Sequence, residues 1–129
     1  MAKKTLPQTG KAFSAFLARI ADDKLASDIT VMDLQNIESA PADYFVLCTC
    51  ESEPQLKAVV DSVEEACVQV GIQKARKEGY GTSHWILLDF FDVILHIMMK
   101  DARSLYKIEK LWGDAIFFEL SDKGRLKKK

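Results

Sequence analysis

Two apolar runs of strand length, Trp85–Leu88 and Val93–Met98, flank the four residues Asp89-Phe90-Phe91-Asp92 and constrain the fold more than any other segment. Because side chains alternate between the two faces of a strand, a hairpin here assigns each of them to one face. One face is entirely aliphatic and is expected to pack against the core. It carries Ile86, Leu88, Val93, Leu95 and Ile97.

The opposite face of the hairpin mixes aliphatic residues with an indole, an imidazole and a carboxylate. It carries Trp85, Leu87, Asp89, Ile94, His96 and Met98. If the loop is Phe90-Phe91, Trp85 lies opposite His96, about 5 Å away. If the loop is Phe91-Asp92, Trp85 lies opposite Met98, and the two faces stay the same. This face is therefore either core with a hydrogen-bonded His96 or a surface that binds another molecule.

The remaining periodic segments predict helices and further strands. Helical spacing predicts a helix over 11–25, and alternation predicts a strand over 29–33. The apolar run Tyr44–Cys50 is typical of a strand covered on both faces. Ser52 as N-cap and Gly71 after the last turn delimit a second helix. A short polar strand is expected within 72–83, and a third helix over 102–112, between Asp101 and Gly113.

The order of these elements predicts a layered α-β-α domain of the α/β class, with a mixed, mostly five-stranded sheet. The hairpin forces an antiparallel pair, whereas strand-helix-strand units favour parallel pairs. A chain of 129 residues with 48% hydrophobic composition can form one domain with a substantial core. We predict a flexible N-terminus over 1–10, the domain over 11–115 and an extension with a basic tail over 116–129.

Charge and cysteine content limit the class of protein. A formal net charge of -1 excludes the positive electrostatic field that a general nucleic-acid binder is expected to have. The residues from Ser121 onward carry +4, which predicts a disordered solubilising tail or a weak RNA contact. Three cysteines without a secretory leader indicate no disulfide framework, and no run approaches the roughly 18 to 20 apolar residues of a membrane span. We therefore expect a soluble cytoplasmic protein.

Candidate catalytic groups do not form a recognisable site. Asp89 and Asp92 are separated by a turn, so they do not project side by side as a two-metal carboxylate pair would. Cys48 and Cys50 lie on a predicted buried strand without a second cysteine pair to complete a zinc site. Phosphate-binding and nucleophile-elbow motifs are absent from the sequence. The sequence therefore indicates no metal, no cofactor and no enzymatic activity.

Aromatic side chains favour a binding function instead. Trp85, Tyr106 and Trp112 are of the type that dominates interface energetics. On the predicted third helix, Tyr106 lies at the edge of an apolar stripe that is expected to face the core. That stripe carries Leu105, Ile108, Leu111 and Trp112.

The segment from Glu78 to Ala115 resembles the signature of the ribosomal silencing factor (RsfS/Iojap) family. In that family a Glu-Gly pair precedes a Trp-led strand, an Asp-Phe-Gly-Asp turn, a strand with a His, and a closing Tyr-x-Leu-Glu-x-Leu-Trp-Gly-Asp-Ala. The matching residues here are Glu78, Gly79, Trp85, Asp89, Phe90, Asp92, His96, Tyr106, Glu109, Leu111, Trp112, Gly113, Asp114 and Ala115. The resemblance extends upstream to about Phe13.

The resemblance implies a nucleotidyltransferase-like fold without its chemistry. Members bind the large ribosomal subunit at its fourteenth protein, on the face that meets the small subunit. They thereby block subunit joining and repress translation when nutrients are short, and many form homodimers. An active nucleotidyltransferase is the alternative. The residues expected to bind the partner are His84, Trp85, Leu87, His96, Met98, Tyr106, Lys110 and Leu111.

Three departures from the family pattern affect local structure. Phe91 replaces the turn glycine, Cys50 replaces a glycine before the second helix, and Ile108 replaces a leucine. Because phenylalanine disfavours a positive φ, we expect a type I turn or a longer loop at Phe91.

Overall fold

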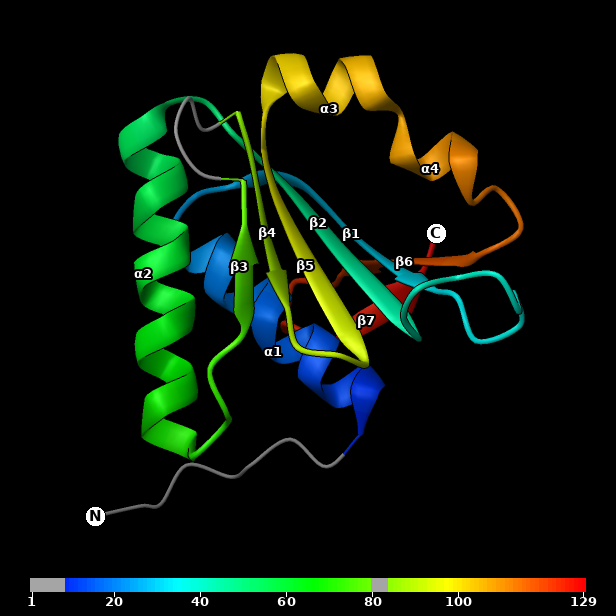
Figure 1. Cartoon of the computed structure of the whole chain (residues 1–129), viewed down its shortest axis with the longest axis horizontal. Coiled ribbons are helices and arrows are strands. Elements are labelled where there is room, and N and C mark those ends of the chain that lie inside the picture. The colour runs from blue at the N-terminus through cyan, green and yellow to red at the C-terminus, as the bar shows by residue number, and fades with distance from the viewer. Residues whose placement is uncertain (1–8, 80–83) are drawn as a thin grey trace.

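The computed structural model describes residues 9–79 and 84–129, which form helices around one mixed sheet (Figure 1). The helices are α1 (Gly10–Asp23), α2 (Glu53–Val70), α3 (Lys100–Tyr106) and α4 (Ile108–Leu111). The strands are β1 (Ser27–Asp33), β2 (Tyr44–Cys50), β3 (Arg76–Glu78), β4 (Trp85–Asp89), β5 (Val93–Met99), β6 (Ile116–Leu120) and β7 (Leu126–Lys128). Residues 1–8 of the predicted flexible N-terminus lie outside the described residues, as do residues 80–83.

The sheet has the order β3-β4-β5-β2-β1-β6-β7. Strands β2 and β5 pair in parallel, and the other neighbouring strands pair antiparallel, so the predicted mixed sheet is confirmed. The predicted number of strands is wrong, because the sheet formed by residues 9–79 and 84–129 has seven strands instead of five. The two further strands come from residues 116–129, the predicted extension.

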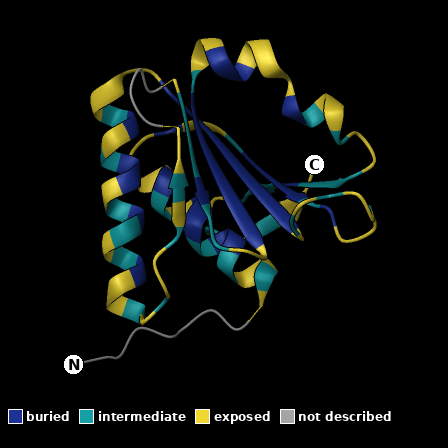
Figure 2. Cartoon of the chain, in the orientation of Figure 1, coloured by how far each residue is buried: buried dark blue, intermediate teal, exposed yellow. Residues whose placement is uncertain are grey.

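Helices cover both faces of the sheet, which confirms the α/β class. One core cluster joins α1 and α2 to the first face, through residues such as Leu17, Val59 and Leu95. A second cluster joins α3 and α4 to the opposite face, through Ala102 and Ile108. Between the two layers the central strands are buried along their length (Figure 2). Apolar contact on both faces is what a run such as β2 requires.

Local sequence signals set the ends of the long helices. The Ser52 hydroxyl accepts a hydrogen bond of 3.2 Å from the Gln55 amide, and the Gln55 side chain accepts one of 2.7 Å from the Glu51 amide. This reciprocal arrangement satisfies free amides at the start of α2. Gly71 ends the helix with a φ of 79°, a conformation that glycine adopts without steric cost. Thr9 caps α1 in the same way, through the Ala12 amide.

Residues 116–129 fold as a strand pair rather than as a disordered tail. β6 pairs with the outer edge of β1, and β7 pairs with β6. Phe118 is buried in the first core cluster, and Leu126 packs against it from β7. The turn between the strands is held from α1, where Arg19 Nη1 donates a hydrogen bond of 3.0 Å to the Gly124 carbonyl. Apolar alternation in this segment therefore outweighs the basic charge of its end.

The predicted third helix is broken into α3 and α4. Lys107 lies between them with φ 48° and ψ 53°, the left-handed conformation that ends a helix. A continuous helix would have placed the predicted apolar stripe on one side. Instead Ile108 is buried, whereas Leu105 and Leu111 are each 73% exposed.

Phe91 has a φ of 80°, a conformation that is unfavourable for phenylalanine. The Asp92 amide donates to the Phe90 carbonyl over 3.1 Å, and the Phe90 amide donates to the Val93 carbonyl over 2.9 Å. The Asp89 carboxylate accepts a hydrogen bond of 2.7 Å from the Phe91 amide. These bonds close the hairpin tightly around Phe91, so the expected type I turn or longer loop is wrong.

Candidate partner-binding surface

The register of the hairpin decides between the two predicted loops. Trp85 pairs with Met98, and Leu87 pairs with His96, as the Phe91-Asp92 loop requires. Ile86 and Leu88 then face the first core cluster with β5 residues such as Leu95. The assignment of side chains to the two faces is therefore confirmed.

The predicted binding residues divide into a buried floor and an accessible layer. Met98 has no exposed surface, and His96 is almost fully buried at 4% exposure. Trp85 and Leu87 are partly buried beside them. The accessible residues are His84, Lys110, Tyr106 and Leu111. In this structure Met98 and His96 can act only through the side chains that they support, whereas the partly exposed Trp85 and Leu87 and the accessible residues can contact another molecule directly.

Trp85 is held by a hydrogen bond to His96 and by contact with the ring of Tyr106. Its Nε1 donates a hydrogen bond of 3.1 Å to Nδ1 of His96, and its ring lies 4.8 Å from that of Tyr106, measured between centroids. Tyr106 is 51% exposed, so one side of this aromatic pair faces solvent. The hydrogen bond fixes the indole plane, and the tyrosine ring covers it.

His96 is neutral in this arrangement. Burial, together with the positive charge of Arg103, lowers the pKa of His96 to about 4. Because Nδ1 accepts from the indole, the ring proton of neutral His96 is on Nε2, which has no hydrogen-bond partner among the described residues. At neutral pH His96 thus acts as an acceptor that orients Trp85.

Further aromatic rings extend the floor toward α4. The Phe45 ring lies edge-on to His96 at 4.6 Å and to Trp112 at 6.2 Å. Edge-to-face pairs of this kind add to the apolar contact of the rings. The sequence signature therefore places Trp85, His96 and Trp112 in one continuous cluster with Phe45.

The break at Lys107 exposes apolar side chains beside this cluster. Leu105 and Tyr106 end α3, and Leu111 ends α4, all three largely exposed. Leu105 belongs to the predicted core-facing stripe but lies on the surface, so the helical periodicity does not predict its exposure. Large apolar side chains that gather on a surface favour contact with a partner.

A hydrogen-bonded pair, His84 and Asp101, borders the surface at the start of α3. His84 Nδ1 lies 2.8 Å from a carboxylate oxygen of Asp101. The hydrogen bond from His84 is the main cause that lowers the pKa of Asp101. The His84 carbonyl also accepts a hydrogen bond of 2.7 Å from the Met99 amide, which ties the entry of β4 to the end of β5. Both contacts hold His84 at the rim.

The candidate catalytic groups of the sequence serve structural roles here. Asp89 accepts the hydrogen bond that closes the hairpin turn, and its carboxylate lies 3.6 Å from the Arg76 guanidinium. Cys48, Cys50 and Cys67 are buried free thiols. Within residues 9–79 and 84–129, no three His, Cys, Asp or Glu side chains converge to hold a metal ion. The described helices include none long and apolar enough to cross a membrane.

Comparisons with known proteins agree with the signature in the sequence. A family model described as "Ribosomal silencing factor during starvation" matches residues 7–129. The ribosomal silencing factor RsfS of Bacillus subtilis is 39% identical over 110 residues, which cover 85% of this chain and 92% of that protein. The chloroplastic protein Iojap of Zea mays is 29% identical over 112 residues, covering 84% of this chain and 47% of that protein.

Solved structures show the same fold. A crystal structure of a Chromobacterium violaceum protein superposes with a TM-score of 0.73 and 29% identity, over 81% of this chain and 88% of that one. A Bacillus halodurans protein gives a TM-score of 0.65 and 35% identity, over 75% of this chain and 90% of that one. On the family match, the sequence identity and the shared fold, this chain belongs to the ribosomal silencing factor family.

Proposed function

We propose that this protein binds the large ribosomal subunit through its fourteenth protein and prevents the small subunit from joining. Translation would thereby be repressed in the cytoplasm under nutrient limitation. Membership of the ribosomal silencing factor family supports a role in silencing, and the resemblance in the sequence supports this particular mechanism. The role is one of binding rather than catalysis.

The observation that carries the proposal is the exposed side of the Trp85–Tyr106 pair. The two rings are tilted at 45° with their centroids 4.8 Å apart, and Leu105 and Leu111 are exposed nearby in the sequence on α3 and α4. Aromatic anchors surrounded by aliphatic contacts are typical of the energetic centre of an interface. Lys110 and His84 supply a polar rim of the kind that surrounds such a centre.

The buried members of the predicted site act indirectly in this proposal. His96 orients the Trp85 indole through its hydrogen bond, and Met98 lies beside Trp85 as its partner on the neighbouring strand. Leu87 is partly exposed and lies on the same face. These three residues shape the surface, whereas Tyr106 and Leu111 touch the partner.

Sedimentation of purified ribosomal subunits tests the proposal directly. A molar excess of the protein should lower the fraction of joined ribosomes and should sediment with large subunits alone. Tyr106→Ala removes an exposed anchor and should weaken both effects. If joining is unchanged by the parent protein, or if the protein sediments with small subunits, the proposed function is wrong.

Two further partners belong to the same proposal. Homodimers would bury apolar surface that the ribosome otherwise covers, and light scattering of the free protein tests for them. The exposed side chains of Lys123, Arg125 and Lys128 would add a weak, salt-dependent contact to ribosomal RNA.

An active nucleotidyltransferase would instead turn over nucleotides with Mg²⁺ and lose this activity in Asp89→Asn. We expect no turnover.

A further inference from the structure

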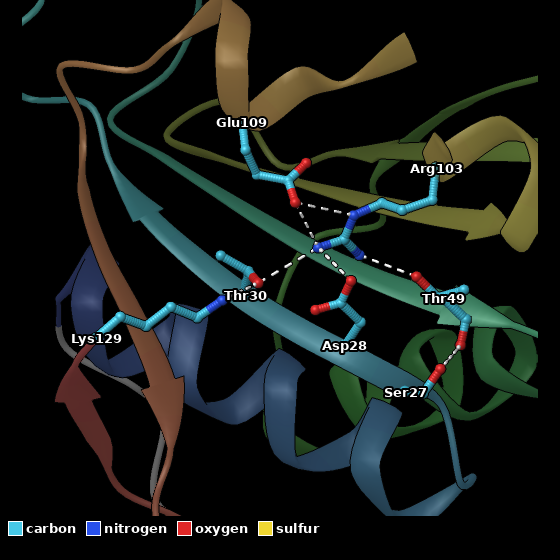
Figure 3. A network of polar contacts seen from close by, with 7 residues as sticks. All are labelled: Ser27, Asp28, Thr30, Thr49, Arg103, Glu109 and Lys129. Atoms are coloured by element: carbon cyan, nitrogen blue, oxygen red, sulfur yellow. Dashed lines mark hydrogen bonds and ion pairs between the residues drawn. The ribbon is translucent and has the colours of Figure 1, made fainter. Parts of the chain in front are cut away.

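Arg103 lies between α3 and the sheet with only 6% of its side chain exposed. Its guanidinium donates to the hydroxyl oxygens of Thr49 over 3.0 Å and of Thr30 over 3.3 Å (Figure 3). It also donates twice to one carboxylate oxygen of Glu109, over 3.0 and 3.3 Å. The sequence gives no sign of this burial, because an arginine in a charged helical segment reads as solvated.

Opposite charges accompany the buried guanidinium. Glu109 and Asp28 lie 3.0 and 3.6 Å from Nη2 of Arg103, and both are carboxylates (Figure 3). The register of β1 shifts between Ser27 and Thr30, and Asp28 within this shift has a φ of 48°. Irregular pairing of this kind redirects side chains at the end of a strand. A buried arginine is tolerated in proteins when its charge is paired and its donors are satisfied, as they are here.

The ion pair between Arg103 and Glu109 spans the break between the two helices. Arg103 belongs to α3 and Glu109 to α4, with left-handed Lys107 between them. Neither helix has a side-chain cap at its N-terminus, and α4 has only four residues. A helix of one turn is not stable by itself, so tertiary contacts must hold it. For α4 these are the packing of the buried Ile108 and the hydrogen bond that Arg103 donates to Glu109.

The relative placement of the exposed anchors depends on the same break. Tyr106 is the last residue of α3, and Leu111 is the last residue of α4. A rotation at Lys107 would move one against the other without disturbing the sheet below. Arg103 opposes this rotation because its planar guanidinium binds the sheet and α4 at the same time.

We propose that Arg103 is a positioning residue that sets the angle between α3 and α4 and thereby aligns Tyr106 with Leu111 for partner binding. The alignment for binding rests on the proposed function, whereas the control of the helix angle does not. Arg103 itself does not touch the partner. Glu109 is the member of the ion pair that can be substituted, because it is partly exposed and can be changed without leaving a cavity in the core.

The test compares Glu109→Ala with Glu119→Ala. Each change removes one carboxylate from an ion pair, since Glu119 lies 3.6 Å from Lys127 on the strand pair β6–β7. Glu109→Gln is a second variant that keeps the size of the side chain. Three quantities are measured for each protein: the melting temperature, hydrogen exchange of individual amides, and affinity for isolated large subunits. The Lys110 and Trp112 amides report on α4, because each donates within it.

We expect Glu109→Ala to accelerate exchange in α4 and to weaken binding by about tenfold, while amides of β2 and β5 exchange as in the parent. The melting temperature should fall by no more than a few degrees. Glu109→Gln should have a smaller effect in the same direction, and Glu119→Ala should leave both exchange in α4 and affinity unchanged. A purely structural role would instead accelerate exchange throughout the sheet.

The outcomes separate the two proposals. Unchanged exchange in α4 for Glu109→Ala overturns the role of Arg103, whatever the ribosome assay shows. Faster exchange with unchanged affinity overturns the alignment for binding. If the parent protein itself does not bind large subunits, the proposed function fails, and the exchange data alone then decide whether Arg103 sets the helix angle.

Discussion

A Cβ atom on Gly79 would overlap the backbone carbonyl oxygen of Trp85, so the end of β3 passes β4 at a distance that only glycine permits. Gly79 also has a φ of 94°, which L side chains rarely adopt. The Glu-Gly pair of the sequence signature thus has a physical role. Gly79 lets the chain pass directly beside Trp85, which is one member of the Trp85–Tyr106 pair.

Gly79→Ala should destabilise the protein by roughly 3 kcal/mol, because backbone strain and the overlap with Trp85 add together. Gly71→Ala is the matched control. With a φ of 79°, Gly71→Ala introduces backbone strain but no steric overlap, since nothing lies within 4 Å of the added Cβ. It should cost about 1 kcal/mol. Urea denaturation measures both, and equal losses would show that the close approach to Trp85 has no energetic weight.

Tyr106→Ala should weaken binding to large subunits by about thirtyfold, the loss typical for an interface aromatic. Because Tyr106 is about half exposed, the melting temperature should change by only a few degrees. Val68→Ala removes a similarly exposed apolar side chain from α2 and should bind like the parent. Equal binding by Tyr106→Ala and the parent would exclude the Trp85–Tyr106 pair from the interface.

Acid should destabilise the parent more than His96→Gln. The pKa of His96 is about 4 in the folded protein and 6.5 when unperturbed, so the unfolded chain binds the proton first as pH falls. Stability is full above pH 6.5 and decreases as pH falls from there toward 4, by up to roughly 3 kcal/mol. A glutamine amide can still accept the Trp85 hydrogen bond but does not titrate.

The comparison isolates His96 from the carboxylates. The pKa values of Asp101 and Glu109 are also lowered in the fold, so their protonation destabilises both proteins alike at still lower pH. Urea midpoints measured across this range give the difference. If the two proteins lose stability in parallel between pH 6.5 and 4, His96 is not buried in its neutral form.

Phe91→Gly should stabilise the protein by about 0.5 to 1 kcal/mol, because glycine relieves the positive φ of the turn at some cost in chain entropy. The Phe91 ring is 85% exposed and contributes little contact of its own. Phe91→Ala removes the ring but keeps the strain, so it should match the parent in thermal denaturation. A loss of stability in Phe91→Gly would show that the ring stabilises the hairpin.

The parts of the fold that could be predicted are those whose signals are local. Ser52 and Gly71 each mark one end of α2 through contacts within a single helical turn. The alternation of β4 and β5 assigns their side chains to the same two faces whichever of the two loops joins the strands. Burial of the run from Tyr44 to Cys50 follows from its composition alone. In each case neighbouring residues in the sequence carry the whole signal.

The parts that could not be predicted depend on distant contacts. The sequence around Lys107 does not indicate a helix break. The break is stabilised by Arg103, whose guanidinium binds residues of β1 and β2. Strand β6 needs the edge of β1 as its partner, some 85 residues earlier in the chain, so basic residues near it suggested a disordered tail. For the candidate surface, Trp85 and Tyr106 were recognised as anchors, but their contact depends on how α3 folds back over β4.

The place of β6 in the sheet has a consequence for synthesis of the chain. β1 pairs with β2 on one side as soon as residues 44–49 have been made, but its other side waits for residues 116–118. Until then Val31, Met32 and Asp33 offer unpaired backbone groups along a hydrophobic strand. Open strands of this kind recruit other chains. A nascent or truncated protein lacking residues 116–118 is therefore expected to aggregate through β1, however complete its helices are.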